Sequence, residues 1–413
     1  MSDPTARATL PAAPEQVRSA TLEPVPPRRA RPAAARSTLL VVGIVGFIVV
    51  GIAAVIVVAY FLSILGPQLT FVGGLLALVP LTIVLLGVRW IDRWEPEPFG
   101  LLLFAFFWGA GVSVVLALTV DTGVQIALST RGGPTDMTQQ LQSIVQAPIV
   151  EESAKGLGVL LIFLVARKYF DGPVDGIVYA ATVAGGFAFS ENIQYFGIQI
   201  AQEGGFDGSV GQVFFIRGLL SPFAHVMFTS MTGLFIGIAA RQSSRLRGVG
   251  LFFVGLIPAI LLHSLWNGAL SVVSDFFGYY ALVQMPLFAT TVVGVVLLRR
   301  REIRLTQLRL GEYAAGGWFS AAEIQSLATP VGRRRSVAWA KAHGHAKLMR
   351  SYIRNVTRLA YARNRIVTQR DGRVSAQADE ATLLVSITSQ RAQLAAALAS
   401  TAATQTHRPV AGQ

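Results

Sequence analysis

Long apolar stretches alternate with short polar ones along this chain, and that alternation predicts transmembrane helices. An α-helix needs about 20 residues to cross a bilayer, and eight stretches approach that length. They cover about 38–65, 69–88, 99–122, 143–166, 175–199, 217–240, 249–271 and 280–298. We therefore expect an all-α fold, a polytopic membrane helix bundle of about eight transmembrane helices.

The polar flanks of these stretches predict their orientation. Arginine and lysine residues cluster before the first stretch and after the second, fourth, sixth and eighth. The loops on the opposite side of the membrane contain few basic residues beyond Arg131 and Arg217. Because cytoplasmic loops carry the excess of basic residues, both termini are expected in the cytoplasm.

Three regions are expected along the chain. Residues 1–37 are rich in Pro, Ala and Arg and predict a disordered cytoplasmic tail. Residues 38–300 form the expected transmembrane core. Residues 301–413 predict a basic cytoplasmic tail, partly helical and partly disordered, because 16 Lys and Arg against 6 Asp and Glu lie between positions 302 and 413.

Two patterns in this C-terminal tail predict local structure. Ser320, followed three residues later by Glu323, predicts a capping box at the start of a helix. The basic amphipathic stretch 333–365 predicts a pair of helices that lie against anionic lipid headgroups. Nucleic acid is a weaker candidate for the partner of this stretch.

Composition agrees with a membrane protein and narrows its chemistry. Hydrophobic residues make up 53% of the chain and charged residues 14%, which is not the balance of a soluble domain. The net charge is +13, most of it in the C-terminal tail. The chain has no cysteine, which excludes disulfides, thiolate nucleophiles and cysteine metal sites.

Ionisable groups inside four of the apolar stretches need an explanation, because each costs at least ~2.5–3.5 kcal/mol in hydrocarbon. Those four stretches carry, in chain order, Glu151, Glu152 and Lys155; Glu191 and Asn192; His225; and His263 with Asn267. One group in each stretch lies 16 residues from a charged residue at its cytoplasmic flank. At about 1.5 Å per residue this predicts a common depth of about 24 Å, in the outer part of the membrane. We therefore expect one polar constellation there.

Helical spacing adds detail to this constellation. Glu151 and Lys155 are separated by four residues and Glu152 and Lys155 by three, so the lysine can neutralise one carboxylate and leave the other available. His263 and Asn267 share a helix face, where both could donate to a developing oxyanion.

Two hydrolytic chemistries fit these residues. In one, a glutamate takes a proton from water and the water attacks a peptide carbonyl. In the other, zinc or another divalent metal activates the water. The candidate catalytic residues are Glu151, Glu152, Glu191, His225, His263 and Asn267, with Lys155 and Asn192 in support. The candidate metal ligands are Glu151, Glu191, His225 and His263.

The residues alone leave non-enzymatic alternatives open. A transporter or an immunity-type membrane protein could use the same Glu and His cluster to bind an ion or a partner. A structural role for the whole cluster is the third alternative. Ser190, within "FAFSEN", is expected to be a helix-packing residue and not a nucleophile.

The order of the motifs resembles a known family. "EESAK" matches an EExxK pattern and "FAFSEN" an FxxxEN pattern, and an isolated His and an HxxxN follow in the next two stretches. "DRWEPEP" at 92–98 precedes the third stretch. Together these residues resemble the PrsW family of intramembrane proteases, in the superfamily of type II CAAX-prenyl endopeptidases and bacteriocin self-immunity proteins.

The resemblance implies a role for each residue. Glu151 would be the general base, with Glu152 orienting it and Lys155 pairing the second carboxylate. Glu191 would hold water or a metal. His225 would be the imidazole of the third motif. His263 and Asn267 would be the pair that lies on the side of the oxyanion. It also implies a metalloprotease of the bacterial plasma membrane that cuts single-pass membrane proteins, such as anti-sigma factors, on the extracytoplasmic side.

Overall fold

The protein is helical throughout the part that the structure covers. The computed structural model describes residues 33–130, 132–205, 208–242, 244–368 and 373–406, and no strand occurs among them. The all-α prediction is confirmed for these residues. The predicted N-terminal tail lies outside them over residues 1–32.

The chain divides into two compact units. Within the described residues, one comprises 33–298 and the other comprises 299–406. Each is described by itself below.

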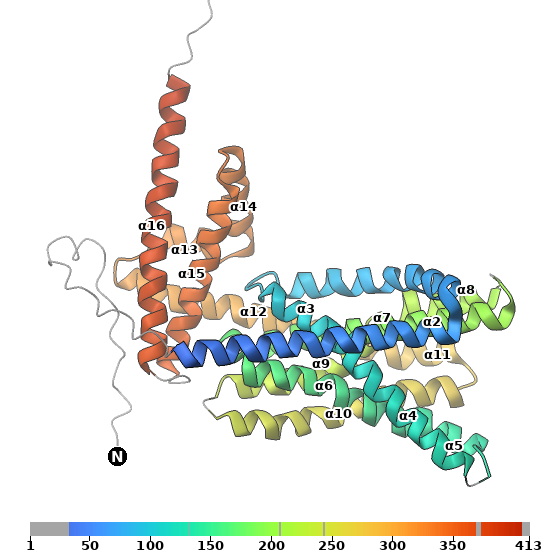
Figure 1. Ribbon diagram of the computed structural model, residues 1–413. Helices are drawn as coiled ribbons and strands as arrows, with labels where there is room; N and C mark the ends of the chain where they lie inside the picture. The colour runs from blue at the N-terminus through green and yellow to red at the C-terminus, as the bar shows by residue number, and fades with distance from the viewer. Residues whose placement is uncertain (1–32, 131, 206–207, 243, 369–372, 407–413) are drawn as a thin grey trace, which may run out of the picture. The chain divides into compact units, whose positions relative to one another are not determined.

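The first unit begins with a helical hairpin. Helix α2 (Ala33–Ile91) is interrupted at Gly66, whose φ of 76° breaks the helical backbone just before Pro67. Left-handed φ values favour glycine, and proline cannot donate the next helical hydrogen bond, so the chain reverses here. Figure 1 shows the two arms of α2, in two shades of blue, running in opposite directions from this turn.

The rest of this unit is a series of helices, several of which contain wide π-helical turns. In chain order they are α3 (Phe99–Phe107), η1 (Trp108–Ser113), α4 (Val114–Ser129), α5 (Asp136–Leu141), η2 (Gln142–Gln146), α6 (Ala147–Val165), η3 (Arg167–Tyr169), α7 (Pro173–Glu203), α8 (Gly208–Phe214), η4 (Phe215–Leu220), α9 (Ala224–Ala240), α10 (Arg245–Val272), α11 (Phe276–Tyr279), η5 (Tyr280–Gln284) and α12 (Met285–Ala315). The π-helical segments are η1, η2, η4 and η5.

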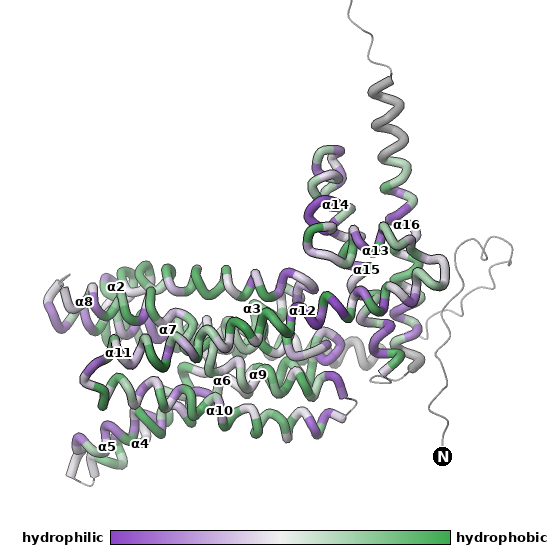
Figure 2. Tube along the Cα trace, turned by 180° about the vertical axis from the view of Figure 1, so that it is seen from behind, coloured by the Kyte–Doolittle hydropathy of each residue, from purple (hydrophilic) through white to green (hydrophobic). Residues whose placement is uncertain are grey.

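Five helices of the described chain are long and apolar enough to cross a membrane. They are Leu40–Ile91, which includes the Gly66 turn, Phe99–Ser129, Gly208–Ala240, Arg245–Val272 and Phe276–Ala315. Figure 2 shows apolar residues over much of these helices, and many of their large side chains are exposed. Helices α6 and α7 are not among the five. They carry the buried Glu and Lys residues of the predicted constellation.

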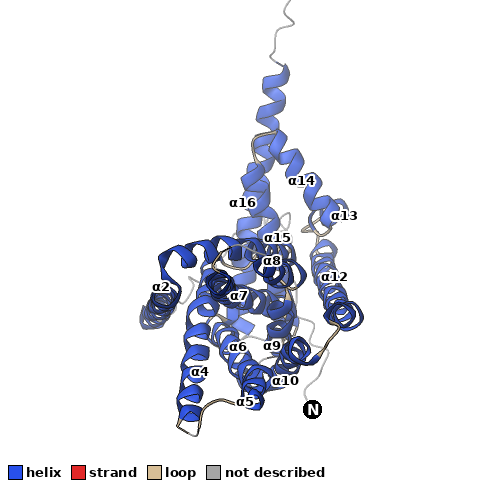
Figure 3. Cartoon of the chain, turned by 90° about the vertical axis from the view of Figure 1, so that its right-hand side faces the viewer, coloured by secondary structure: helices blue, strands red, loops and turns tan. Residues whose placement is uncertain are grey.

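Helix α7 is the central helix of the bundle. It packs against α2, α3, α6 and α9, and most of its side chains are buried. Figure 3, a view along the helices, shows it between α2 and α9. Such close packing depends on glycine: a Cβ on Gly186 would lie 2.1 Å from the carbonyl oxygen of Phe106, and one on Gly176 would lie 2.0 Å from that of Gly233. Glycine at these two positions therefore permits the helices to approach closely.

The segment before α3 closes one end of the bundle through buried carboxyl groups. Asp92 accepts a hydrogen bond from the backbone N–H of Glu97 at 3.0 Å, and the Tyr179 hydroxyl donates to the Glu97 carboxylate. Burial raises the pKa of Asp92 to about 7 and the pKa of Glu97 well above its usual range. This end of the bundle therefore binds protons more tightly when folded.

The second unit is a small helical domain with its own core. Its helices are α13 (Ala321–Leu327), α14 (Pro330–Ala342), α15 (Ala346–Val367) and α16 (Arg373–Thr406), which follow the end of α12. Ser320 and Glu323 form the predicted capping box of α13, and the predicted helical pair over 333–365 is present as α14 and α15. Apolar residues such as Tyr313, Leu359 and Ile387 are buried together.

Charged side chains support this second core. Arg363 bonds to Glu312 at 2.8 Å, and the Tyr313 hydroxyl donates to Glu380. The network ties α12 to α15 and α16.

Candidate functional site

The glutamate and lysine residues of "EESAK" lie close together on α6, as their spacing predicts. The ammonium of Lys155 lies 2.6 Å from Glu152 Oε1 and 3.5 Å from Glu151 Oε2. Its side chain is 0% exposed. A buried ammonium requires a nearby anion, and Glu152 is the closer of the two.

Glu152 is fully occupied by partners from three helices. Its Oε1 accepts from Lys155 and lies 3.0 Å from His263 Nδ1 on α10, and its Oε2 accepts from the Thr229 hydroxyl on α9 at 2.8 Å. With all these hydrogen bonds made, this carboxylate is suited to orienting its neighbours.

Glu151 is the more available carboxylate. Its side chain is 12% exposed, and it lies 3.5 Å from the Lys155 ammonium and 3.8 Å from His263 Nε2. The expectation that one glutamate is neutralised and the other stays available is confirmed, with Glu152 as the neutralised one.

Glu191 on α7 is bound by a residue that the sequence patterns did not single out. Arg217, in the π-helical segment η4, lies 2.6 Å from Glu191 Oε2, donates through Nε to Asn192 Oδ1 at 3.0 Å and stacks on the ring of Tyr195. The same Glu191 oxygen lies 2.8 Å from His225 Nε2. Arg217 thus fixes the carboxylate that holds His225.

The hydrogen-bond partners fix the tautomers of the two imidazoles. A carboxylate only accepts, so His225 donates from Nε2 to Glu191 and His263 donates from Nδ1 to Glu152. Nδ1 of His225 therefore keeps its lone pair, which accepts from the Lys155 ammonium at 3.3 Å. Nε2 of His263 keeps its lone pair and faces Glu151.

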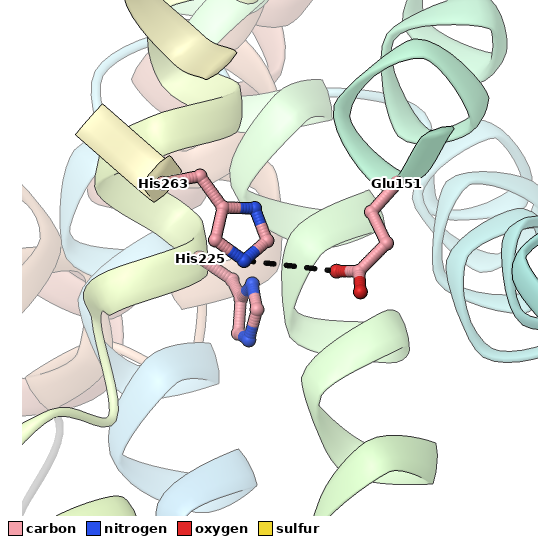
Figure 4. Close-up of side chains that lie close together, drawn as sticks. All are labelled: Glu151, His225 and His263. Carbon is pink, nitrogen blue, oxygen red and sulfur yellow. Dashed lines mark ion pairs between the residues drawn. The ribbon is translucent and has the colours of Figure 1, made fainter. Parts of the chain in front are cut away.

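The imidazoles of His225 and His263 lie close to the carboxylate of Glu151. Glu151, His225 and His263 each offer one ligand atom, and the three atoms lie within 4.8 Å of one another. Figure 4 shows the three side chains meeting from separate helices, with a dashed line for the 3.8 Å approach of His263 Nε2 to Glu151. Glu191, the other residue predicted as a metal ligand, is not part of this group and lies behind His225.

Aromatic rings enclose the polar groups. The Lys155 ammonium lies 4.2 Å from the centroid of the Phe187 ring, and His263 stacks on Phe228 with ring centroids 5.0 Å apart. The rings of His225 and His263 meet edge to face at 5.1 Å. This apolar surround strengthens the electrostatic interactions between the groups inside it.

Wide π-helical turns provide hydrogen-bond acceptors around the site. Asn267 donates to the carbonyl oxygen of Ser143 in η2 at 2.8 Å, and Ser190 donates to that of Ala110 in η1 at 2.8 Å. A π-turn disrupts the regular i to i−4 ladder, so side chains must satisfy the backbone groups that it frees. One N–H of the Asn267 amide is thus used structurally, and Ser190 is a packing residue as predicted.

Comparison with known proteins identifies the family. The sequence model of a family described as "PrsW family intramembrane metalloprotease" matches residues 97–291. The chain is 31% identical to the Protease PrsW of Clostridioides difficile (strain 630) over 193 residues, which are 47% of this chain and 76% of that protein. The chain belongs to the PrsW family.

Other relatives support this membership. The chain is 30% identical to the Protease PrsW of Bacillus subtilis (strain 168) over 191 residues, 46% of this chain and 78% of that one. The corresponding protein of Geobacillus kaustophilus (strain HTA426) is 29% identical over 192 residues, 46% of this chain and 75% of that relative. No solved structure matches. The PrsW match includes every residue of the site.

Arg217 and Thr229 are the site residues that sequence reasoning missed. The sequence pattern marks Arg217 only as a weak basic flank of the sixth apolar stretch. Arg217 lies at the start of an apolar stretch, and a charged residue inside the membrane needs a partner. That position was the signal in the sequence that could have identified it. Thr229 offered no comparable signal, because a threonine in a membrane helix commonly bonds its own backbone.

Proposed function

We propose that this PrsW-family chain is an intramembrane endopeptidase whose catalytic centre consists of Glu151, His225 and His263, acting with a divalent metal. The observation that supports this most is the convergence of one carboxylate oxygen and two imidazole nitrogens within 4.8 Å. The family favours a protease over the transporter and immunity-type alternatives.

The chemistry of the donor set fits a catalytic zinc ion. Zinc in hydrolases is commonly held by two histidines and a glutamate, with an open position for water. Both imidazoles here are backed by a carboxylate, Glu152 for His263 and Glu191 for His225, as is typical of metal-bound histidines. A bound metal would lower the pKa of a water molecule and polarise the peptide carbonyl.

The chain's own residues then have separate tasks. If one oxygen of the Glu151 carboxylate holds the metal, its other oxygen would take the proton of the attacking water and return it to the nitrogen of the departing amine. Glu152 and Glu191 hold the two imidazoles in the tautomers described above. Lys155 neutralises the charge of Glu152. The second N–H of the Asn267 amide would donate a hydrogen bond to the oxyanion.

A glutamate mechanism without metal is the second candidate, and one contact favours it. The Lys155 ammonium lies 3.3 Å from His225 Nδ1 and 3.5 Å from Glu151, in the region where the ligand atoms converge. There it could stabilise the oxyanion itself.

Metal analysis combined with cleavage separates these mechanisms. The purified full chain, reconstituted with a single-pass membrane substrate, is expected to contain about one metal per chain. Glu151→Gln and His263→Ala should each lower cleavage at least 100-fold, and His225→Ala and His263→Ala should lose the metal. His343→Ala, which removes a histidine of the second unit, serves as the control and should change neither quantity. Full activity in metal-free protein would contradict the metal mechanism, and normal cleavage by Glu151→Gln would contradict both.

We further propose how the chain lies in the membrane. The two arms of α2, the α3–α4, α5–α6 and α8–α9 segments, α7, α10 and the α11–α12 segment would make eight crossings. Both termini would then be cytoplasmic in a bacterial plasma membrane, with the site nearer the extracytoplasmic face. The basic flanks support this orientation.

The substrate and partners are also proposals. A single-pass membrane protein, with anti-sigma factors as the candidate class, is the proposed substrate, and the wider kinship with CAAX-prenyl endopeptidases and immunity proteins is proposed with it. Helices α14 and α15 are proposed to contact anionic headgroups, since positions 324–370 contain 11 Lys and Arg and no acidic residue. Exposed basic side chains there include Arg334, Arg350, Arg354 and Arg358.

A further inference from the structure

A cavity lies beside the catalytic centre. The space inside it that the centre of a water-sized sphere can reach is about 20 Å³, and it is partly open to solvent. Its walls are formed by Ala188, Asn192, Arg217, Ser221, Pro222, Ala224, His225 and Trp266. Because His225 belongs both to this wall and to the converging ligand group, a peptide bound at the centre would extend into the cavity.

The polar groups of this cavity are mainly hydrogen-bond donors. Asn192 uses its oxygen to accept from Arg217 Nε, and Ser221 donates to the carbonyl oxygen of Ile216. Nδ2 of Asn192 and Nη1 of Arg217 make no hydrogen bond to any residue that the structure describes. The charge of Arg217 is balanced by Glu191, so the side chains with N–H groups that line the cavity carry little net charge.

A protease substrate within a membrane has a need that matches these donors. A helical segment must unwind before its peptide bond can be attacked, and unwinding frees carbonyl oxygens from their helical hydrogen bonds. In an apolar environment each unsatisfied carbonyl costs several kcal/mol, so the enzyme must supply donors beside the scissile bond.

We propose that this cavity is a substrate subsite in which Asn192 and Arg217 donate to a main-chain carbonyl oxygen of the residue next to the scissile bond. The ligand class is an unwound stretch of a membrane-spanning peptide. The proposal rests on the proposed protease function, and the experiment below distinguishes failure of the two.

Asn192→Asp tests the donors directly. An aspartate keeps an oxygen for Arg217 Nε and has nearly the same shape, but it replaces the Nδ2 donors with a second acceptor. The KM for a single-pass substrate should rise at least about tenfold, a larger change than any fall in kcat.

Ala188→Leu tests the space. Ala188 lines the cavity and is not one of the residues that offer a ligand atom, so a leucine there would fill the subsite without removing a ligand. The KM should rise with kcat retained. Ala201→Leu, on an exposed part of the same helix α7, is the matched control and should behave as wild type.

Binding measured without cleavage separates the two proposals. In a Glu151→Gln background, a fluorescent peptide of the substrate's membrane segment should bind about tenfold more weakly to the Asn192→Asp and Ala188→Leu proteins. Unchanged binding and unchanged KM in both variants would overturn the subsite, whether or not the wild type cleaves. Failure of the wild type to cleave any membrane substrate would overturn the protease function, and the binding comparison would still decide the subsite.

Discussion

At the scale of single residues, Lys155 explains why charged groups can lie inside the bundle. Its ammonium contacts Glu151, Glu152 and His225 and faces the ring of Phe187, with no exposed surface. A buried charge is tolerated only when it is paired and hydrogen-bonded, and each of these groups supplies part of that requirement. The same contacts fix the protonation of His225, so the lysine connects stability with the chemistry of the site.

Removal of one partner of the Glu152–Lys155 pair should be strongly destabilising. Glu152→Gln leaves a buried ammonium without its closest anion, and we expect a loss of about 3–5 kcal/mol in the free energy of unfolding. The double variant Glu152→Gln with Lys155→Met should recover much of that loss, because no isolated charge remains. Thermal unfolding in detergent measures both. If Glu152→Gln were as stable as the wild type, Glu152 would not be the group that compensates the buried charge of Lys155.

Asp92 should make stability depend on pH. Burial raises the pKa of Asp92 from 3.8 to about 7, so the folded protein holds this proton more tightly than the unfolded chain does. Stability contributed by Asp92 is therefore lost as the pH rises from about 4 to 7. Asp92→Asn keeps the acceptor for Glu97 and should reduce this loss, with the part due to Glu97 remaining. Melting temperatures of the wild type and of Asp92→Asn, measured between pH 4.5 and 8, would show this difference. The same dependence on pH in both proteins would contradict the role of Asp92.

The sequence predicted the charged part of the site well. Glu151, Glu152, Lys155, Glu191, His225 and His263 form one connected cluster, because ionisable residues in apolar helices must find one another. The pattern could not predict which carboxylate is neutralised, or that Asn267 bonds to Ser143 in a π-turn. Those outcomes depend on packing between helices, which a single sequence does not specify.

At the scale of elements, close contact between α7 and α9 sets the geometry of the site. Helix α7 carries Glu191 and α9 carries His225, so the separation of the two helices sets the distance between these groups. Glycine at 176 and 233 lets the backbones approach. The apolar stretches and the turn at Gly66 were predictable from composition and backbone preference, whereas the π-helical turns were not, since they follow from tertiary packing.

Gly176→Ala should separate these helices. The added methyl group would lie 2.0 Å from the Gly233 carbonyl oxygen, so α9 must shift, at an expected cost of about 1–3 kcal/mol in stability. Cleavage should fall as well, because His225 moves relative to Glu191. Gly250→Ala on α10 has no atom within 4 Å of the new methyl group and is the matched control. Equal melting temperatures for the two variants would refute the close-contact argument.

At the scale of the whole molecule, the absence of cysteine makes the proposed topology directly testable. Each single cysteine is then the only thiol in the chain. Ser129→Cys, at the end of α4, should react with a membrane-impermeant maleimide from outside intact cells. Ser244→Cys, at the start of α10, should react only after the membrane is opened. The opposite labelling pattern would place the termini outside.

The central claim concerns the converging group of Glu151, His225 and His263, and X-ray absorption spectroscopy of the purified active protein at the zinc edge tests it most directly. The account predicts about one zinc per chain, bound by two imidazole nitrogens and a carboxylate oxygen at about 2.0–2.2 Å, with one imidazole lost in His263→Ala. Fully active protein without a metal, or a metal whose imidazole ligands persist unchanged in His263→Ala, would contradict it.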